Sequence, residues 1–225
     1  MVLKTPKTAI ILGATGLTGS FLLKRLIADK HYEKIILFSR SATPVKSEKI
    51  EEHLIDLFEL GKHRDKFKAD VVFCCVGSTQ KKTPNNEIYR KVDYGIPVTA
   101  AKLCAENNIE NLLVISAMGA NFKSRFFYNR TKGEMENAVL QQEIRNTYIF
   151  QPSLISGKRE EKRPFEFLGK QIMKFANVLM FGPLKKYQSI QPQTIAKAMQ
   201  EVAQNGYEKI KIESDEIKEI VREDD

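Results

Sequence analysis

Short apolar runs alternate with amphipathic stretches along most of this chain. The apolar runs favour strands at residues 8–12, 35–39, 71–76, 112–116, 147–151 and 209–212, with a weaker one at 53–54. The amphipathic stretches favour helices at 18–28, 93–106, 128–143 and 194–203. This alternation is typical of a parallel sheet covered by helices. We therefore predict a doubly wound, mostly parallel α/β sheet with helices on both faces.

Residues 157–191 interrupt the alternation. They combine basic pairs with two prolines and a series of Phe, Leu, Ile and Met residues. A segment of this kind late in a doubly wound sheet often covers the ligand crevice, so we predict a small, irregular C-terminal lid over the substrate. The alternatives are a helix packed in the core and an amphipathic helix on a membrane surface. The basic pairs at 158–163 either hold an anionic substrate group or lie in a solvated loop.

The composition fits one domain spanning residues 1–225 and limits its partners. Hydrophobic residues make up 42% of the chain and charged residues 28%, as in ordinary globular domains. No apolar run approaches the roughly 20 residues of a membrane helix, and no secretory signal precedes the first strand. The net charge is +8, in scattered basic pairs that suit a phosphorylated ligand or a solvated surface better than nucleic acid. We predict no membrane span and no nucleic-acid partner, whereas the oligomeric state stays open.

Cysteines and histidines argue against disulfides and metals. Cys74 and Cys75 are adjacent in a predicted strand, so their side chains point to opposite faces. Cys104 makes the count odd, and we interpret all three as buried, reduced thiols of a cytoplasmic protein. The three histidines lack the spacing of metal ligands, so we predict no metal site.

A glycine-rich loop connects the first predicted strand to the first predicted helix. Its sequence, from Gly13 to Gly19, is GATGLTG. Three such glycines allow a tight turn, close approach of the backbone to a pyrophosphate and close packing of helix on strand. The helix N-terminus also offers free N–H groups to phosphates. In the context of strand, loop and helix, this motif predicts a dinucleotide site.

The end of the second predicted strand indicates which dinucleotide binds. An acidic residue here would hold the ribose hydroxyls of NAD, but this strand ends with Ser39, Arg40 and Ser41. The Arg40 guanidinium, flanked by two hydroxyls, suits a 2′-phosphate. We therefore predict NADP(H) in preference to NAD(H). The alternative is that Arg40 is only the solvated end of a strand.

Three residues suited to proton and hydride chemistry follow the fifth predicted strand. Ser116 ends that strand, while Tyr128 and Lys132 are four residues apart and share one helix face. An adjacent ammonium and an oxidised nicotinamide both favour the phenolate of a tyrosine, whose pKa is ordinarily about 10. We predict that Tyr128 exchanges the proton, that Lys132 tunes it and contacts the nicotinamide ribose, and that Ser116 polarises the substrate carbonyl.

Taken together, these segments resemble the short-chain dehydrogenase/reductase superfamily. The resemblance is carried by GATGLTG, the fourth-strand turn FCCVGST, the serine in VISAMGA, the segment FFYNRTKGEMENAV and the QPS after the sixth strand. Softer similarity, which includes KVDYG and KIKIES, is that of the Tat-interacting-protein group of atypical members.

The resemblance implies a Rossmann fold and a cofactor site at defined positions. In this chain the matching residues are Gly13, Thr15, Gly16, Leu17, Thr18 and Gly19 at the pyrophosphate, Ser39 and Arg40 at the adenosine phosphate, Asp56 and Leu57 at the adenine, Cys75, Val76 and Gly77 at the adenosine and ribose, Tyr128 and Lys132 beside Ser116 at the reacting centre, and Pro152 and Ser153 at the nicotinamide. Two departures affect the proton relay: the fourth-strand turn lacks Asn-Asn-Ala-Gly, and Asp93 replaces a helix asparagine.

These observations predict an NADP(H)-dependent oxidoreductase acting on a small carbonyl or alcohol. A cofactor-binding redox sensor or regulatory protein is one alternative, although it has no need of Ser116, Tyr128 and Lys132 together. A sugar-nucleotide epimerase or dehydratase is another. Such enzymes usually have a larger C-terminal substrate domain, and only about 70 residues follow Ser153 here.

Overall fold

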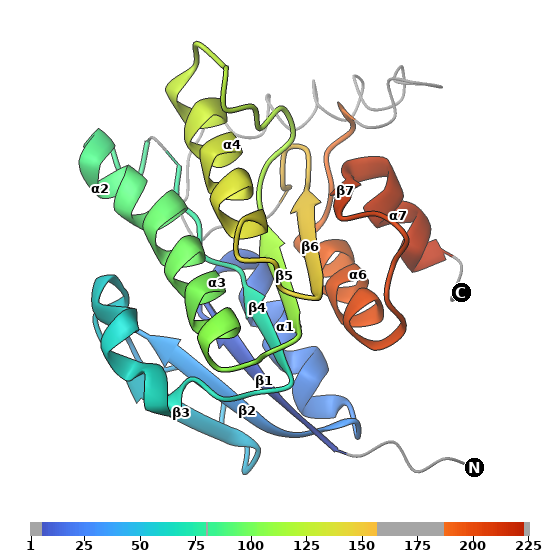
Figure 1. Ribbon diagram of the computed structural model, residues 1–225. Coiled ribbons are helices and arrows are strands. Elements are labelled where there is room, and N and C mark those ends of the chain that lie inside the picture. Colours follow the sequence, from blue (N-terminus) through green and yellow to red (C-terminus); the bar gives the residue numbers. More distant parts are fainter. Residues whose placement is uncertain (1–5, 80, 157–186, 223–225) are drawn as a thin grey trace, which may run out of the picture.

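A single parallel sheet of seven strands forms the centre of the molecule in the computed structural model, which describes residues 6–79, 81–156 and 187–222. The strands are β1 (Lys7–Leu12), β2 (Tyr32–Ser39), β3 (Ile50–Leu54), β4 (Val71–Cys74), β5 (Asn111–Ile115), β6 (Asn146–Gln151) and β7 (Lys211–Glu213). Their order is β3-β2-β1-β4-β5-β6-β7, and every pairing is parallel. The predicted fold class is confirmed (Figure 1).

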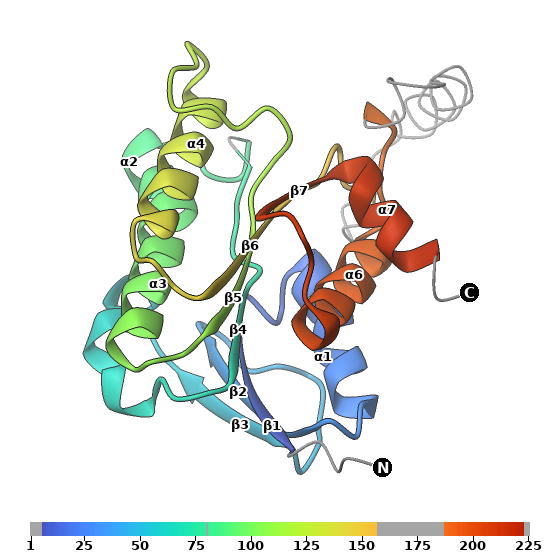
Figure 2. The same ribbon diagram turned by 45° about the vertical axis from the view of Figure 1, so that its right-hand side comes forward.

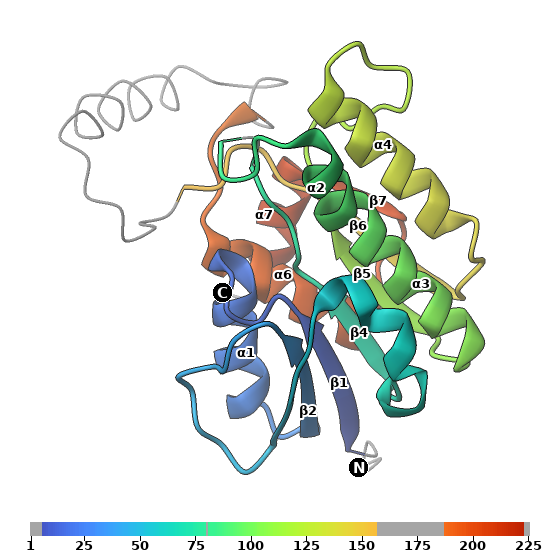
Figure 3. The ribbon, with the colours of Figure 1, turned by 90° about the vertical axis from the view of Figure 1, so that its left-hand side faces the viewer.

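Helices cover both faces of this sheet, as Figure 2 shows. One face carries the 3₁₀ segment η1 (Leu57–Lys66), α2 (Asn86–Arg90), the π-helical turn η2 (Lys91–Gly95), α3 (Ile96–Glu106) and α4 (Phe127–Leu140), and the other face carries α1 (Leu17–Ala28), α6 (Pro192–Asn205) and α7 (Ser214–Arg222). Seen from the side in Figure 3, α3 and α4 lie next to each other. Among the described residues no helix has the length and apolar character needed to cross a membrane.

Alternation along the strands divides the buried residues into two cores. Ala9 and Ile11 of β1 pack toward α1 and α6, whereas Ile10 and Leu12 pack toward α3 and α4, and all four are fully buried. Successive side chains of a strand point to opposite faces, which explains why the buried strands are apolar without interruption. Each fully buried isoleucine or leucine side chain contributes about 1.5–3 kcal/mol by leaving water.

Several predicted boundaries differ from the structure. The fourth strand ends at Cys74, two residues early, because the chain then turns toward a cavity. The third strand spans five residues, of which the sequence indicated two, because its polar side chains are only partly buried at the sheet edge. The predicted helix 93–106 begins as the π-helical turn η2, which contains the buried Asp93. Of the predicted lid at 157–191, residues 157–186 lie outside the described residues.

The acidic stretch near the C-terminus forms α7, which the sequence did not predict. Ile217 is buried in the same core as α6. Asp215 and Glu216 lie in the first turn of α7, where carboxylates favour the helix dipole. Glu216 accepts a hydrogen bond from the backbone N–H of Glu213 at 2.7 Å and pairs with Lys209 at 2.5 Å. The negative charges therefore stabilise a helix that closes one end of the sheet.

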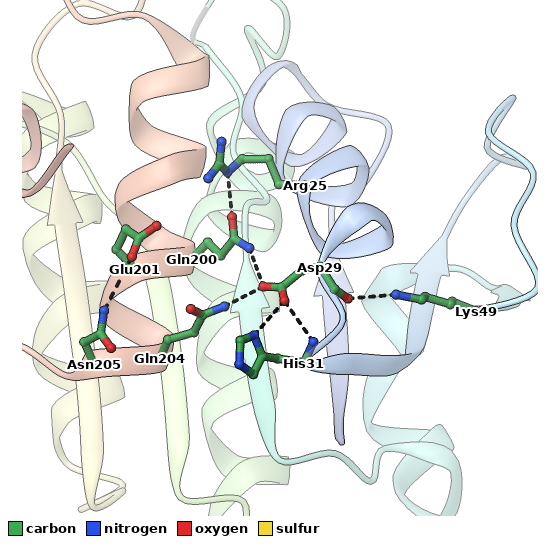
Figure 4. A network of polar contacts seen from close by, with 8 residues as sticks. All are labelled: Arg25, Asp29, His31, Lys49, Gln200, Glu201, Gln204 and Asn205. Atoms are coloured by element: carbon green, nitrogen blue, oxygen red, sulfur yellow. Dashed lines mark hydrogen bonds and ion pairs between the residues drawn. The ribbon is translucent and has the colours of Figure 1, made fainter. Parts of the chain in front are cut away.

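A polar network joins α1 to α6 at the amino ends of the strands (Figure 4). Asp29, which ends α1, accepts hydrogen bonds from the backbone N–H of His31 at 2.9 Å and from its Nδ1 at 2.8 Å. Its second oxygen accepts from the side-chain amides of Gln200 and Gln204, both at 2.5 Å. Arg25 donates to Gln200 at 2.6 Å. We call these residues the Asp29 network.

Candidate cofactor and active site

A cavity of about 920 Å³ opens at the carboxyl ends of β1, β2 and β4, near the upper end of the ~300–1,000 Å³ range of ligand pockets. Eleven residues predicted from the sequence line it, namely Gly13, Thr15, Gly16, Leu17, Ser39, Arg40, Asp56, Leu57, Cys75, Val76 and Gly77. Residues that the sequence analysis missed also contribute, among them Ser20, Phe58, Ser78, Lys82 and Thr83. The structure thus brings the predicted pyrophosphate and adenosine positions into one cavity.

The glycine loop leaves the N-terminus of α1 open toward this cavity. Gly13 has a φ of +85°, and a Cβ there would lie 3.0 Å from the backbone of Cys75. Gly16 caps α1 without a side-chain hydrogen bond, so the first N–H groups of the helix remain available to an anion. A Cβ on Gly19 would lie 2.1 Å from the carbonyl oxygen of Gly13. Gly19 and the buried Thr18 therefore pack α1 against the loop and do not line the cavity.

The end of β2 contains a carboxylate that the sequence analysis did not anticipate. Ser39 is buried, and its hydroxyl donates to the carbonyl oxygen of Ser41 at 2.9 Å, with Glu52 of β3 3.3 Å away. Glu52 also accepts from the backbone N–H of Thr43 at 2.9 Å. The residues that directly follow β2 contain no carboxylate, but the neighbouring strand supplies this one. Glu52 orders the loop after β2 and does not line the cavity, which leaves the exposed Arg40 facing it.

A buried ion pair lies directly behind the cavity wall. The Lys132 ammonium is 2.8 Å from Oδ1 of Asp93, and the two side chains are 4% and 0% exposed. The other Asp93 oxygen accepts from the backbone N–H of Ser78 at 2.8 Å. A Cβ on Gly77 would lie 3.4 Å from Asp93 and 3.7 Å from Lys132. Gly77 lines the cavity, so only its bare backbone separates the cavity from the pair.

Tyr128 lies one turn before Lys132 on α4 and is only partly exposed. Burial raises the pKa of its phenol; the Lys132 ammonium opposes this effect and the Asp93 carboxylate adds to it. Burial alone would lower the pKa of Lys132, but Asp93 and Tyr128 raise it on balance. The ammonium lowers the pKa of Tyr128 as expected, yet it does not prevail in the protein alone, because burial of the phenol outweighs it and the Asp93 charge adds to the effect of burial.

Ser116 follows β5 directly and donates its hydroxyl hydrogen to a second buried carboxylate. The acceptor is Oε1 of Glu136, at 2.5 Å. The side chain of Gln151 donates to the same oxygen at 2.8 Å, and the Lys211 ammonium is 2.8 Å from Oε2. The sequence analysis missed Glu136, although its position four residues after Lys132 placed it on the same helix face.

The remaining predicted positions lie outside the cavity. Ser153 is buried, donates to the carbonyl oxygen of Gln188 at 2.5 Å and lies 2.9 Å from the hydroxyl of Ser214. Pro152 is buried beside it and accepts from the backbone N–H of Met118 at 3.0 Å. Neither residue, nor Ser116, Tyr128 or Lys132, is among those that line the cavity.

Cysteines and acidic residues offer no metal centre in the part of the chain that the structure describes. No three His, Cys, Asp or Glu side chains there could share a metal ion. The three cysteines are free thiols. Burial raises the pKa of Cys74 to about 11, so its thiol is a poor nucleophile.

The fold and the loop geometry define an NAD(P)-binding protein of the Rossmann type. The chain belongs to the NAD(P)H-binding family, which its residues 13–171 match. It is 35% identical over 162 residues to the mitochondrial protein FMP52 of Meyerozyma guilliermondii, which covers 70% of this chain and 68% of that protein. It is 30% identical over 169 residues to HTATIP2 of Rattus norvegicus, which covers 73% and 69%. These are atypical short-chain dehydrogenase/reductase proteins, so the resemblance read from the sequence is confirmed.

A solved structure confirms the same fold at larger evolutionary distance. The enzyme WbmG of Bordetella bronchiseptica, in complex with NAD and UDP, superimposes with a TM-score of 0.69 at 13% identity. The match covers 94% of this chain and 74% of WbmG. At this identity the likeness concerns the fold alone.

The relatives correct one expectation. The yeast proteins that this chain matches are named mitochondrial, so the prediction of a cytoplasmic protein is wrong. It rested on reduced cysteines and on the lack of a secretory signal, and neither observation distinguishes the cytosol from other compartments in which thiols stay reduced.

Proposed function

We propose that this protein is an NADP(H)-dependent oxidoreductase that interconverts a small carbonyl compound and its alcohol. One observation carries the proposal. The bare backbone of Gly77, which lines the cavity, lies against the Lys132 ammonium, and Lys132 shares a helix face with Tyr128. Lys132 also lies 3.5 Å from the carbonyl oxygen of Ile115, the residue before Ser116. Lys132 therefore lies next to the cofactor cavity, and the proposal places the reacting carbonyl beside Lys132, Tyr128 and Ser116.

The residues present fit a dinucleotide. The uncapped N-terminus of α1 offers N–H groups to a pyrophosphate. Gly13 and Gly16 permit the approach of a ligand to the backbone. When bound, the nicotinamide supplies or accepts the hydride. Arg40 and Lys82 are cations in the wall of the cavity, and the guanidinium of Arg40 is suited to a 2′-phosphate.

The chain's own residues handle the proton. The pKa of Tyr128 is raised above its ordinary value, so the phenol is protonated at neutral pH and ready to donate to a carbonyl oxygen. Lys132 restrains that rise and stabilises the phenolate left after donation. Asp93 fixes Lys132 and the turn after β4 through two contacts of 2.8 Å, so that the ammonium does not drift into solvent.

The role of Tyr128 is tested by Tyr128→Phe. We expect turnover to fall by about 10²–10⁴-fold, the usual contribution of a general acid or base, because the aromatic ring remains but the proton is gone. Binding of NADPH, followed by fluorescence titration, should stay within about threefold of wild type. Tyr207→Phe is the matched control, because that tyrosine lies on the opposite side of the sheet among the partners of α6 and α7. Near-normal turnover of Tyr128→Phe across a panel of carbonyls would refute this function.

The cofactor preference is tested by thermal shift with NADPH and NADH. We expect NADPH to stabilise the wild type more, and Arg40→Ala to weaken NADPH binding by about 10–100-fold while NADH binding is unchanged, since a charge-assisted hydrogen bond contributes about 1.5–3 kcal/mol. Arg145→Ala is the control, because Arg145 is exposed and pairs with Glu110 far from the cavity. Stronger stabilisation by NADH would overturn the preference.

A cofactor-binding redox sensor is the second candidate. It is favoured by the hydrogen bond of Ser116 to Glu136, which directs that hydroxyl hydrogen away from a substrate. Tight NADPH binding without turnover of any carbonyl or alcohol would support the sensor. A sugar-nucleotide epimerase is the third candidate, and WbmG, which shares the fold, was solved in complex with NAD and UDP. Stabilisation by nucleotide sugars in the presence of NAD(P) would support it.

A further inference from the structure

The Ser116 hydroxyl has a single hydrogen, and the structure directs it to Glu136. A carboxylate only accepts hydrogen bonds, so Ser116 is the donor across the 2.5 Å contact with Oε1. Its oxygen then has only lone pairs left to offer to any other group. This is the reverse of the role expected from the sequence, in which Ser116 donates to a substrate carbonyl.

We propose that Glu136 is a positioning residue that makes Ser116 a hydrogen-bond acceptor, so that the site binds the alcohol member of its substrate pair more tightly than the carbonyl member. The inference rests on the proposed function. An alcohol oxygen can accept from the protonated Tyr128 and donate to Ser116. A carbonyl oxygen has no hydrogen to donate, so its lone pairs would face the lone pairs of Ser116. Of Tyr128 and Ser116, only Tyr128 could then donate a hydrogen bond to the carbonyl.

Three strands and one helix fix the Glu136 carboxylate. Glu136 is fully buried on α4, two turns beyond Tyr128. Ser116 follows β5, Gln151 ends β6 and donates to Oε1 at 2.8 Å, and Lys211 of β7 places its ammonium 2.8 Å from Oε2. The ammonium compensates the buried charge, which would otherwise be costly. The direction of the Ser116 hydrogen is therefore set by regular secondary structure rather than by a loop.

Glu136→Gln should reverse the preference. The amide oxygen of the glutamine will face the Lys211 ammonium, so its NH₂ group faces Ser116 and Gln151. The Gln151 amide can turn to accept through its oxygen, and the Ser116 hydroxyl hydrogen is then free for a carbonyl. We expect alcohol binding to weaken and carbonyl binding to tighten, each by about fivefold, as for one net hydrogen bond. Opposite changes distinguish this role from a structural one, because a distorted site would weaken both ligands.

The measurement uses matched pairs, beginning with 4-nitrobenzyl alcohol and 4-nitrobenzaldehyde and continuing with cyclohexanol and cyclohexanone. Inhibition constants of the alcohol against the NADPH-loaded protein, and of the carbonyl against the NADP⁺-loaded protein, report binding without chemistry. Glu134→Gln is the matched control: it makes the same chemical change two residues earlier, where the side chain pairs with Arg90, and should alter neither constant.

Ser116→Ala keeps the inference testable if Glu136→Gln does not fold. We expect this substitution to weaken binding of the alcohol and to leave binding of the carbonyl unchanged or tighter. Weaker carbonyl binding in Ser116→Ala, or parallel changes of both constants in Glu136→Gln, would overturn the inference while the wild type still turns over. Failure of the wild type to bind or convert any pair would instead refute the proposed function, and the inference with it.

Discussion

Two carboxylates, Asp29 and Asp93, each hold together elements that are distant in the sequence, but their surroundings differ. Asp29 accepts four hydrogen bonds, two on each oxygen, from side chains and backbone at the amino ends of the strands (Figure 4). Asp93, at the carboxyl ends, accepts from the backbone N–H of Ser78 on Oδ2, and its Oδ1 lies 2.8 Å from the Lys132 ammonium.

The difference separates a carboxylate that holds the fold from one that adjoins the proposed active site. The lone pairs of the Asp29 carboxylate all accept hydrogen bonds, so neutralising this carboxylate would weaken several contacts at once. Asp29 therefore holds α1 and α6 together. Asp93 is fully buried beside Lys132, and its negative charge raises the pKa of Tyr128. Sites that exchange protons are often less completely hydrogen-bonded than sites that only hold the fold.

The largest expected effect on stability comes from breaking the Asp93 pair. Lys132→Met would leave the Asp93 charge buried without a cation, so we expect the free energy of unfolding to fall by about 3–5 kcal/mol. Urea unfolding monitored by circular dichroism measures it. The double variant Asp93→Leu/Lys132→Met should recover much of the loss, because a packed apolar pair often replaces a buried ion pair without cost. A loss below about 1 kcal/mol in Lys132→Met would contradict a dry, buried pair.

Removing the Asp29 carboxylate should lower the free energy of unfolding by a smaller amount. Asp29→Ala removes four hydrogen bonds, but water reaches part of the released donors, so we expect a loss of about 2 kcal/mol. Unfolding in urea gives the value, and Lys34→Ala, whose surface ion pair with Glu51 is exposed on both sides, is the control with a loss below about 1 kcal/mol. Turnover should stay within twofold of wild type, because the network lies at the amino ends of the strands and the cavity lies at their carboxyl ends.

The smallest expected effect is the contribution of Asp29 to the pH dependence of the free energy of unfolding. Burial alone would raise the pKa of this carboxyl, but the hydrogen bonds from His31 and Gln200 lower it below the ordinary value. A carboxyl whose pKa is lower in the native state than in the unfolded chain stabilises the fold at a pH above its unfolded-state pKa, which is about 3.9. This stabilisation is lost as the pH falls through the native-state pKa. The stability difference between wild type and Asp29→Asn should therefore be constant above about pH 5 and shrink in acid. A difference that grows in acid would show that the sign is wrong.

Much of the fold could be predicted because local patterns and the global fold agree. The glycine loop stands between an apolar strand and a helix, and in the structure it occupies that position with Gly13 at positive φ. Strands that are buried on both faces can be recognised in the sequence as apolar runs. The edge strand β3 was predicted only weakly and the helix α7 not at all, because their side chains are half polar and tertiary contacts decide their conformation.

The partners of the candidate site could not be read from spacing alone. Glu136 shares a helix face with Lys132, but its contact with Ser116 and Lys211 depends on how α4 lies over β5 and β7. Glu52 reaches Ser39 because β3 is in register with β2, with Phe38 opposite His53. Such contacts join residues that are distant in the chain, and a single sequence specifies them only through the complete packing.

The π-helical turn η2, from Lys91 to Gly95, makes the position of Asp93 depend on the number of residues in this segment. Such a turn contains one residue more than an α-helical turn would need. Deleting one residue would restore the α-helical pattern and rotate α3 by about 100° relative to α2, which would turn Asp93 away from Lys132. Substitutions elsewhere in η2 change side chains at a fixed geometry, whereas a change of length here would separate the residues to which we assign proton transfer. The spacing between α2 and α3 is therefore as much a part of the proposed active site as the residues that touch the ligand.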